Sequence, residues 1–452
     1  MRVGTVVFLS LVLDLFAFTI PLPLFPRIIE WYAKRELSDP NGFLSRTLAF
    51  VSAVRGLLYT SSRNSEKWDV VLLGGLMGSV FSALQFLVSP HIGSLSDTHG
   101  RKRILLLTMI GNILSAVVWL RSTSFASYML SRVIGGLSEG NVQLAIAILS
   151  DVSTPATRSR ALASIGIAFA LCFCLGPPIG AYFASKPLPS SLTALNVYAL
   201  PALISLVLLL VETAFLAVFL PETKGTKVQE AAGEQEKKGE ASEKGTPQDR
   251  LALLSALRRT HFLFLAVFSG VEFTLTFLTY DLLDWDNRRN GTLLATIGVL
   301  SALLQGGYVR RALARVGEPV IARRGVLACA LSFGLLSLLP RLSETNAVRV
   351  LYSAAALLAY TSATVVNALT AHASLMTSDN AEAEHGDLVK GKALGRFRSS
   401  GQLGRALGPL MACASYWTFG PAVTYATCAG AMVVLSSRMR GLSQYAGKDK
   451  QA

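Results

Sequence analysis

Long apolar runs, separated by short polar turns, recur along almost the entire chain. A helix needs roughly 20 mostly apolar residues to cross a bilayer, and about twelve runs approach or exceed that length. The runs cover residues 4–26, 69–90, 104–121, 125–150, 161–184, 194–220, 260–282, 292–308, 325–340, 347–370, 393–417 and 419–437. This pattern predicts an all-α, multi-pass membrane protein with twelve transmembrane helices.

One polar stretch interrupts the pattern near the middle of the chain. Between Glu222 and Arg259 acidic and basic residues nearly balance and aliphatic residues are sparse, a composition typical of a disordered linker. The stretch separates six predicted spans from six others. We therefore predict helical domains at residues 1–221 and 260–440, a cytoplasmic linker at 222–259 and a tail at 441–452.

Composition and charge agree with a membrane protein. Hydrophobic residues make up 52% of the chain and charged residues 15%, and no polar block is large enough for an enzyme domain. The net charge of +14 raises the question of nucleic-acid binding, but the basic residues gather at alternate turns, as in cytoplasmic loops. We expect no nucleic-acid partner and both termini in the cytoplasm. The plasma membrane is the expected location, with the nuclear envelope, endoplasmic reticulum or vacuole as alternatives.

The turn between the second and third spans carries the most distinctive motif. Its sequence, GSLSDTHGRKR, combines glycines that permit a tight reversal with a basic cluster that marks a cytoplasmic turn. The stretch resembles the loop 2–3 signature of the major facilitator superfamily, G-x-L-x-D-x-x-G-R-K-x. The matching residues are Gly93, Asp97, Gly100, Arg101, Lys102 and Arg103.

The resemblance implies a fold and a gating role for this motif. Members of the superfamily consist of two six-helix bundles joined by a long cytoplasmic loop and transport by alternating access. We expect Asp97 to be held by Arg101 and by the start of the eleventh span when the cytoplasmic side is closed. The corresponding stretch of the second half, from Gly306 to Glu318, keeps glycines and basic residues but lacks the Asp. An asymmetric closure is therefore expected.

Charged residues inside the first six spans are candidates for a substrate or proton pathway, because charge at membrane depth is costly. Asp14 lies in LDLFAFTIPLPLFP, which resembles the first span of drug:proton antiporters. Arg132 opens RVIGGLSEG in the fourth span, shares a helix face with Glu139, and resembles an Arg linked with proton coupling in that family. Either Arg132 holds Asp14 until substrate or conformation separates them, or the pair is permanent and structural.

The fifth span contains GPPIG, from Gly176 through Pro177 to Gly180. This segment is similar to the fifth-span signature of proton antiporters, which implies antiport. Pro kinks a helix, and the glycines would let the two halves rock against each other. Alternatively, the glycines serve tight helix packing alone. Gly408-Pro409 occupies the equivalent place in the eleventh span.

The second half has charged candidates of its own. Glu272 lies within VFSGVEFTLTFLTY, and Arg405 follows Arg398 by seven residues on one helix face. Either these two Arg residues attract an organic anion, or Glu272 and Arg405 neutralise each other across the bundle. The remaining polar candidates inside the spans are Gln85, Asn141 and Asn367.

Within the superfamily the chain most resembles the drug:proton antiporter branch, and there the eukaryotic tetracycline transporter-like group of organic-anion transporters. The likeness lies in GGLMGSVFSALQFLVSPHIGSLSD, SRVIGGLSEGNV, FSGVEFTLTFLT and GRALGP. It implies a secondary active transporter that exchanges a small anionic or amphipathic solute for protons, as a monomer in the lipid bilayer. The alternatives are a uniporter or symporter of a metabolite, and a non-transporting receptor or scaffold. Motifs for phosphate binding or hydrolysis and metal-ligand spacings are lacking, so we expect no enzyme activity, cofactor or metal.

Overall fold

The computed structural model describes residues 2–21, 24–36, 39–58, 65–184, 198–225, 246–285, 287–378 and 385–448. Within these ranges the regular structure is helical, and the one β contact is an isolated bridge between Ser378 and Val389. The fold is therefore all-α, as the apolar pattern predicts.

The first half consists of α1 (Val3–Thr19), α2 (Phe25–Glu36), α3 (Phe43–Leu58), α4 (Ser65–His99), α5 (Arg101–Leu120), α6 (Phe125–Ser138), α7 (Asn141–Asp151), α8 (Pro155–Ala184) and α9 (Ala199–Phe219). The second half consists of α11 (Pro247–Leu283), α12 (Asn287–Leu303), the π-helical turn η3 (Leu304–Val309), α13 (Arg310–Val316), α14 (Glu318–Leu338), η4 (Leu339–Arg341), α15 (Glu344–Leu375), η5 (Gly386–Leu388) and α17 (Lys390–Lys448).

The predicted spans all appear as apolar helices. In the described part of the chain, ten helical stretches are long and apolar enough to cross a membrane, and α1 is a shorter apolar helix of 17 residues. Helix α17 contains two predicted spans, because Gly420 interrupts its helical backbone with a φ of +82°. These elements together account for the twelve spans, and the twelve-helix prediction is confirmed.

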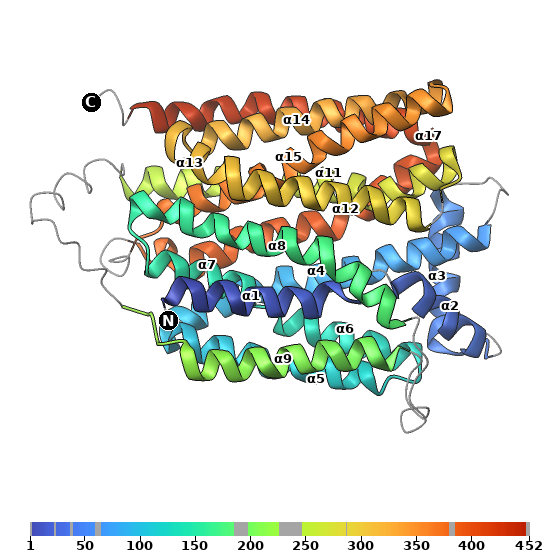
Figure 1. Ribbon diagram of the computed structural model, residues 1–452, viewed down its shortest axis with the longest axis horizontal. Coiled ribbons are helices and arrows are strands. Elements are labelled where there is room, and N and C mark those ends of the chain that lie inside the picture. The colour runs from blue at the N-terminus through green and yellow to red at the C-terminus, as the bar shows by residue number, and fades with distance from the viewer. Residues whose placement is uncertain are drawn as a thin grey trace, which may run out of the picture.

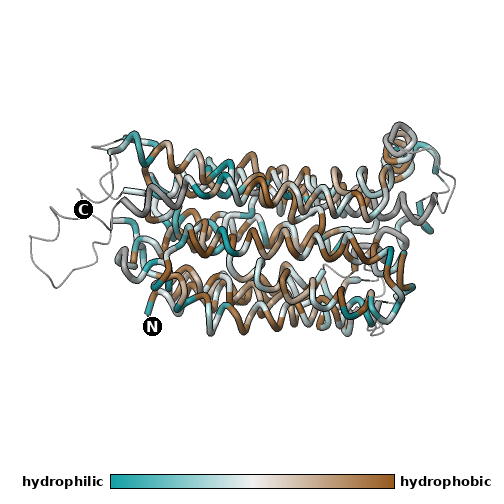
Figure 2. Tube along the Cα trace, turned by 90° about the horizontal axis from the view of Figure 1, so that it is seen from above, coloured by the Kyte–Doolittle hydropathy of each residue, from teal (hydrophilic) through white to brown (hydrophobic). Residues whose placement is uncertain are grey.

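The helices run side by side along the long axis of the molecule (Figure 1). The start of α1 and the end of α17 lie at one end of this array, whereas α2 and α3 lie at the other. We call these the termini end and the α2–α3 end. Hydrophobic residues recur along the helices, and hydrophilic residues gather toward the two ends (Figure 2). This distribution fits an array that crosses a bilayer along its long axis.

Two predicted domain boundaries need correction. Helix α11 begins at Pro247, inside the segment assigned to the linker, because Thr246 and Asp249 form a reciprocal capping box around its first turn. The linker therefore does not extend to residue 259, and residues 226–245 lie outside the described ranges. At the other end, α17 continues to Lys448, so most of the predicted tail is helical.

Two spans are irregular near their middle. Helix α6 ends at Ser138, Glu139 has a ψ of 99°, and α7 starts at Asn141. In the eighth span, η3 replaces a turn of α-helix. Irregular backbone at membrane depth is tolerated only where protein or a water-filled cavity covers it, and π-turns are frequent at functional sites. Both breaks therefore mark candidate places for a functional site, with Gln305 the buried polar side chain of η3.

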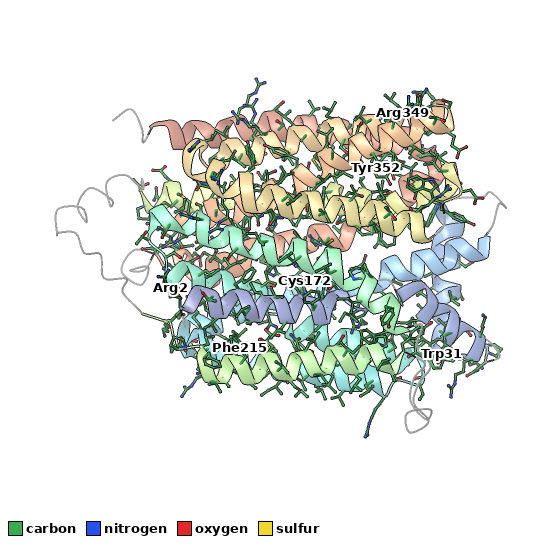
Figure 3. All side chains as sticks on the ribbon, viewed as in Figure 1. Arg2, Trp31, Cys172, Phe215, Arg349 and Tyr352 are labelled. Atoms are coloured by element: carbon green, nitrogen blue, oxygen red, sulfur yellow. The ribbon has the colours of Figure 1, made fainter. Side chains whose placement is uncertain are left out.

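Helices α2 and α3 pack over the α2–α3 end of the first half, where Figure 3 labels Trp31. The hydroxyl of Tyr32 donates a hydrogen bond to the carbonyl of Ser122 at 3.2 Å. Glu36 Oε1 accepts one from the backbone N–H of Phe125 at 2.7 Å and so caps the start of α6.

Candidate functional site

The turn between α4 and α5 lies against the start of α17. Gly100 connects the two helices with a φ of +98°, a conformation that favours glycine. Asp97 accepts hydrogen bonds from the backbone N–H groups of Gly391 at 2.9 Å and Lys392 at 2.7 Å. The same carboxylate pairs with Arg101 Nη1 at 2.7 Å. Asp97 thus caps the positive end of α17, and the contacts expected from the sequence are present.

A second carboxylate extends this contact. Arg101 Nε donates to Asp151 Oδ2 at 2.9 Å, and Lys390 Nζ lies 3.3 Å from Asp151 Oδ1. We call Asp97, Arg101, Asp151 and Lys390 the latch, which joins the two halves at the termini end. Asp151 and Lys390 were not predicted, because their pairing depends on how the two halves meet.

Close backbone packing accompanies the latch. A Cβ atom on Gly93 would lie 2.1 Å from the carbonyl oxygen of Gly391, and one on Gly391 would lie 2.4 Å from that of Gly93. Non-bonded atoms do not approach each other this closely, so both positions require glycine for α4 and α17 to meet. Gly93 lies inside helix α4, so it serves the contact between the halves, and Gly100 alone of the motif's glycines makes the predicted turn.

The other basic residues of the motif face the end of α9 or solvent. Lys102 Nζ donates to the carbonyl of Ala217 at 2.8 Å, whereas Arg103 is exposed. Glu222 accepts hydrogen bonds from the backbone N–H groups of Arg101 at 2.7 Å and Lys102 at 3.2 Å. Partial burial raises the pKa of Glu222, but four backbone N–H donors outweigh this effect and hold its pKa below the usual value.

The second half repeats the turn with different chemistry. Gly317 connects α13 to α14 with a φ of +88°, which matches Gly100. Ala314 stands where the first half has Asp97, and Glu318 directly follows the glycine. The hydroxyl of Ser159, at the start of α8, donates a short hydrogen bond to Glu318. The two turns therefore contact the opposite half differently, and the predicted absence of a second Asp97 equivalent agrees with this difference.

Buried carboxylates gather inside the first half. Asp14 is 4% exposed and accepts a 2.7 Å hydrogen bond from Asn141 Nδ2, so Asn141 contacts a side chain of the predicted pathway. Glu212 on α9 is fully buried and accepts a hydrogen bond from Ser10 Oγ at 2.8 Å. Cys172 of α8, labelled near the middle of Figure 3, lies against α1 with its Sγ 3.4 Å from the carbonyl of Val12.

The basic group opposite these carboxylates comes from the second half. Arg398 of α17 interacts electrostatically with Glu139 and Asp14. Glu139 lies at the break between α6 and α7, where it is hydrogen-bonded to Asn112. The spacing of seven residues between Arg398 and Arg405 predicts that they share a helix face. That Arg398 meets these two acids follows only from the packing of the two halves.

Arg132 lies elsewhere, which corrects the predicted pair with Asp14. Its guanidinium carbon is 5.8 Å from the ring centroid of Trp119 and 5.6 Å from that of Tyr128, a cation–π arrangement. Arg132 precedes Glu139 by seven residues, about 10 Å along a helix, and so lies toward the α2–α3 end. The family motif therefore identified a basic residue of the fourth span that contacts Trp119 and Tyr128 and does not pair with Asp14.

Glu272 and Arg405 face the boundary between the halves. Both are exposed although each lies mid-helix, and they interact electrostatically with each other. The neighbouring Phe273 lies 3.2 Å from the position of a Cβ on Gly75 of α4, so this face of α11 turns toward the first half. Partial mutual neutralisation, one of the two predicted alternatives, agrees with this geometry, and the exposure of Arg405 leaves it accessible to a solute.

The polar candidates divide between the two halves. Gln85 is buried on α4, close to Ser89, whose carbonyl accepts a 2.8 Å hydrogen bond from Gln143 Nε2. Asn367 meets Gln305 of η3 around Gly166 of α8, where a Cβ would lie 2.3 Å from Asn367 Nδ2 and 2.1 Å from Gln305 Oε1. Gln305 was not predicted, because its π-helical turn leaves no simple mark in the sequence.

The glycines of the fifth span form a close helix contact. A Cβ on Gly176 would lie 1.9 Å from Thr19 Oγ1, and one on Gly180 would lie 2.1 Å from the carbonyl of Ile20. Gly404 and Gly408 meet α11 in the same way, so the repeat holds at the level of packing. Tight packing is thus present, and a role of Pro177 in antiport stays a prediction.

Surface cavities lie away from all these residues. Two of them, of about 350 and 530 Å³, share Arg289 and Glu344 at the α2–α3 end of the second half. No cluster of three or more His, Cys, Asp or Glu side chains suited to a metal occurs among the described residues. The charged groups at the boundary between the halves are therefore the stronger candidates for a functional site.

Comparison with known proteins agrees with the geometry. The model of the Major Facilitator Superfamily matches residues 7–409. Human major facilitator superfamily domain-containing protein 10 is 35% identical over 449 residues, which cover 95% of this chain and 90% of that protein. The cattle protein of the same name is also 35% identical, over 98% of this chain and 93% of its own length. A crystal structure described as the human organic anion transporter MFSD10 (TETRAN) superposes with a TM-score of 0.80 and 32% identity, covering 97% of this chain and 99% of that one.

Proposed function

The chain belongs to the major facilitator superfamily, a family of membrane transporters rather than enzymes, and we propose that it moves a small organic anion in exchange for protons. The solute would cross between the two halves by alternating access. The termini end, with its excess of basic turns, would face the cytoplasm, and the chain would act as a monomer.

The observation that carries this proposal is the array of charges on either side of one boundary. Arg398 and Arg405 of the second half face carboxylates inside a membrane protein, where unpaired charge is costly. An accessible Arg offers an organic anion a charge-assisted contact, while the buried Asp14 and the half-buried Glu139 are carboxylates that can bind and release a proton. The description of the human MFSD10 structure as an organic anion transporter supports the substrate class.

The latch supports alternating access. Its hydrogen bonds join the halves at the termini end, and each is a separate contact that can break when the halves part. A scaffold without transport would have no need for charged side chains at the middle of its spans. The same contacts are compatible with a uniporter or a symporter, so the coupling needs a direct test.

The test uses the purified full-length chain in lipid vesicles with radiolabelled p-aminohippurate as a small organic anion. We expect an imposed pH gradient to drive uptake, and Asp14→Asn to abolish the pH response while the protein still inserts. Arg405→Ala should lower uptake about tenfold or more, the loss of one charge-assisted hydrogen bond, whereas the exposed Arg438→Ala control should leave it unchanged. Uptake that ignores the gradient would exclude proton antiport, and intact uptake in Arg405→Ala would exclude Arg405 as the anion site.

A further inference from the structure

Arg398 is held at the boundary between the halves by its own helix. The adjacent Ser399 Oγ donates a hydrogen bond to the carbonyl of Phe86 on α4 at 2.7 Å. One turn earlier, a Cβ on Gly395 would lie 2.7 Å from the carbonyl of Ser89. Both contacts fix this part of α17 against the first half. The position of Arg398 thus depends directly on whether α4 and α17 are together.

The environment of Arg398 is built from acids of the other half. Glu139 occupies the break of the fourth span, and Asp14 is tied to Asn141 at the start of the next helical segment, α7. The Nε of Arg398 is buried and has no hydrogen-bond partner among the described residues. Charge, rather than a closed set of hydrogen bonds, therefore links Arg398 to the acids, and such a link is lost when distance grows.

Other ionisable groups share this environment. The ionisable groups that interact electrostatically with Asp14 are Glu139, Glu212, Cys172 and Arg398. Those that act on Arg398 are Glu139, Asp14, Arg405 and His261. Two acids of the first half, Asp14 and Glu139, thus face one basic group that belongs to the second half, and Glu212 interacts with these acids but not with Arg398. His261 is fixed by stacking on Phe397 with ring centroids 4.2 Å apart.

We propose that Arg398 is the positioning residue that links proton binding by Asp14 and Glu139 to the separation of the two halves. The inference rests on the proton antiport proposed above and names how that site is regulated. With the halves together, the guanidinium supplies the counter-charge of the two carboxylates. When α17 moves away, an unpaired carboxylate in a dry interior is costly, and it takes a proton from water on the open side. Arg132 does not have this role, because it belongs to the same half as the acids.

The experiment measures the carboxylic-acid C=O absorption of the purified protein in vesicles by infrared spectroscopy as the pH is varied, without substrate or gradient. Asp14→Asn and Glu139→Gln assign the bands. In Arg398→Gln we expect the protonated form to persist to a pH about one to three units higher, the usual effect of removing an opposite charge. Arg398→Lys should stay near the wild-type curve, and the matched control Arg132→Gln should superpose on it.

A second variant keeps the inference testable if Arg398→Gln does not fold. Asp97→Asn leaves Arg398 in place but weakens the latch, so the bands should move in the same direction. Unchanged bands in both variants, or an equal shift in Arg132→Gln, would overturn the role of Arg398. Because the titration needs no transport, bands that move as expected in a chain that ignores a pH gradient would support the link while rejecting antiport. Uptake driven by a pH gradient, together with absorption bands that do not move, would support antiport while rejecting the role of Arg398.

Discussion

Removing the charge of Asp97 should favour the state in which the halves are separated at the termini end. Asp97 accepts hydrogen bonds from Gly391 at 2.9 Å and Lys392 at 2.7 Å across the halves, and from Arg101 within its own half. A hydrogen bond to a charged group contributes about 1.5–3 kcal/mol. Asn keeps one acceptor oxygen and loses the charge, so Asp97→Asn removes at least one such contribution. The ratio of open to closed molecules should rise about 10- to 150-fold, at 1.4 kcal/mol for each factor of ten.

The rate at which a buried cysteine reacts measures this ratio even when open molecules are rare, because reaction follows the open fraction when opening and closing are fast. Ser374 is fully buried on α15 and its Oγ lies 2.7 Å from that of Ser150 on α7, so Ser374→Cys reports on the contact between halves. A background without the five native cysteines restricts labelling by a membrane-impermeant maleimide to this position.

The matched control is Asp249→Asn. Asp249 also caps a helix start at the termini end, but its partner, Thr246, belongs to the same helix. Labelling should accelerate in Asp97→Asn and stay unchanged in Asp249→Asn. Equal labelling rates in Asp97→Asn and in the parent would refute the view that Asp97 holds the halves together.

Three further predictions concern packing and pH. Gly180→Val should lower the yield and melting temperature of the folded protein, because the Cβ of the new valine would clash with the carbonyl of Ile20. In the control Gly334→Ala the added Cβ meets open space, so the stability should change by no more than about 1 kcal/mol. Asp387→Asn should cost less than about 1 kcal/mol at neutral pH. Two basic side chains of α17 lower the pKa of Asp387 to about 2. The contribution of Asp387 to stability is therefore present above its unfolded pKa and is lost as the pH falls toward 2. The difference in melting temperature between variant and parent should accordingly be the same at pH of about 5 and 8. Glu222→Gln should lower the melting temperature at neutral pH. Because the pKa of Glu222 is lowered in the folded protein, Glu222 stabilises the fold only in its charged form. The difference in melting temperature between variant and parent should therefore shrink as the pH falls below about 4.

The sequence predicts those features that depend on local pattern. Apolar runs locate the spans, and the spacing of Gly93, Asp97 and Gly100 locates the turn. The early start of α11 was also visible, because Thr246 and Asp249 surround Pro247 in the order of a capping box. The polar composition on either side obscured that signal. Local patterns fail where a helix breaks inside an apolar run, as at Glu139, since nothing in the residue types there excludes a continuous helix.

Contacts between the halves are beyond local pattern. Asp151 pairs with Lys390, more than two hundred residues away in sequence. The residues next to each of them in the sequence give no sign of this pairing. The same holds for Arg398 and its acids. Arg132 seemed the better partner because family resemblance supplied it, but depth along the helix decides which charges meet. Sequence reasoning therefore paired Asp14 with a base of its own half, whereas the packing of the halves brings Arg398 of the second half close to Asp14 and Glu139.

The difference between the two turns has a physical consequence for how the halves separate. Gly100 and Gly317 adopt nearly the same backbone conformation, yet Asp97 caps α17 with two hydrogen bonds while Glu318 receives one from Ser159. A second copy of the Asp97 contacts would add two bonds of about 1.5–3 kcal/mol each and favour the closed state by a further factor of roughly 10² to 10⁴. A transporter must leave the closed state in every cycle, so one strong latch and one weaker contact meet opposing requirements. In the alternating-access cycle proposed above, the first contact would seal the termini end, and the second would keep the closed state within reach of opening.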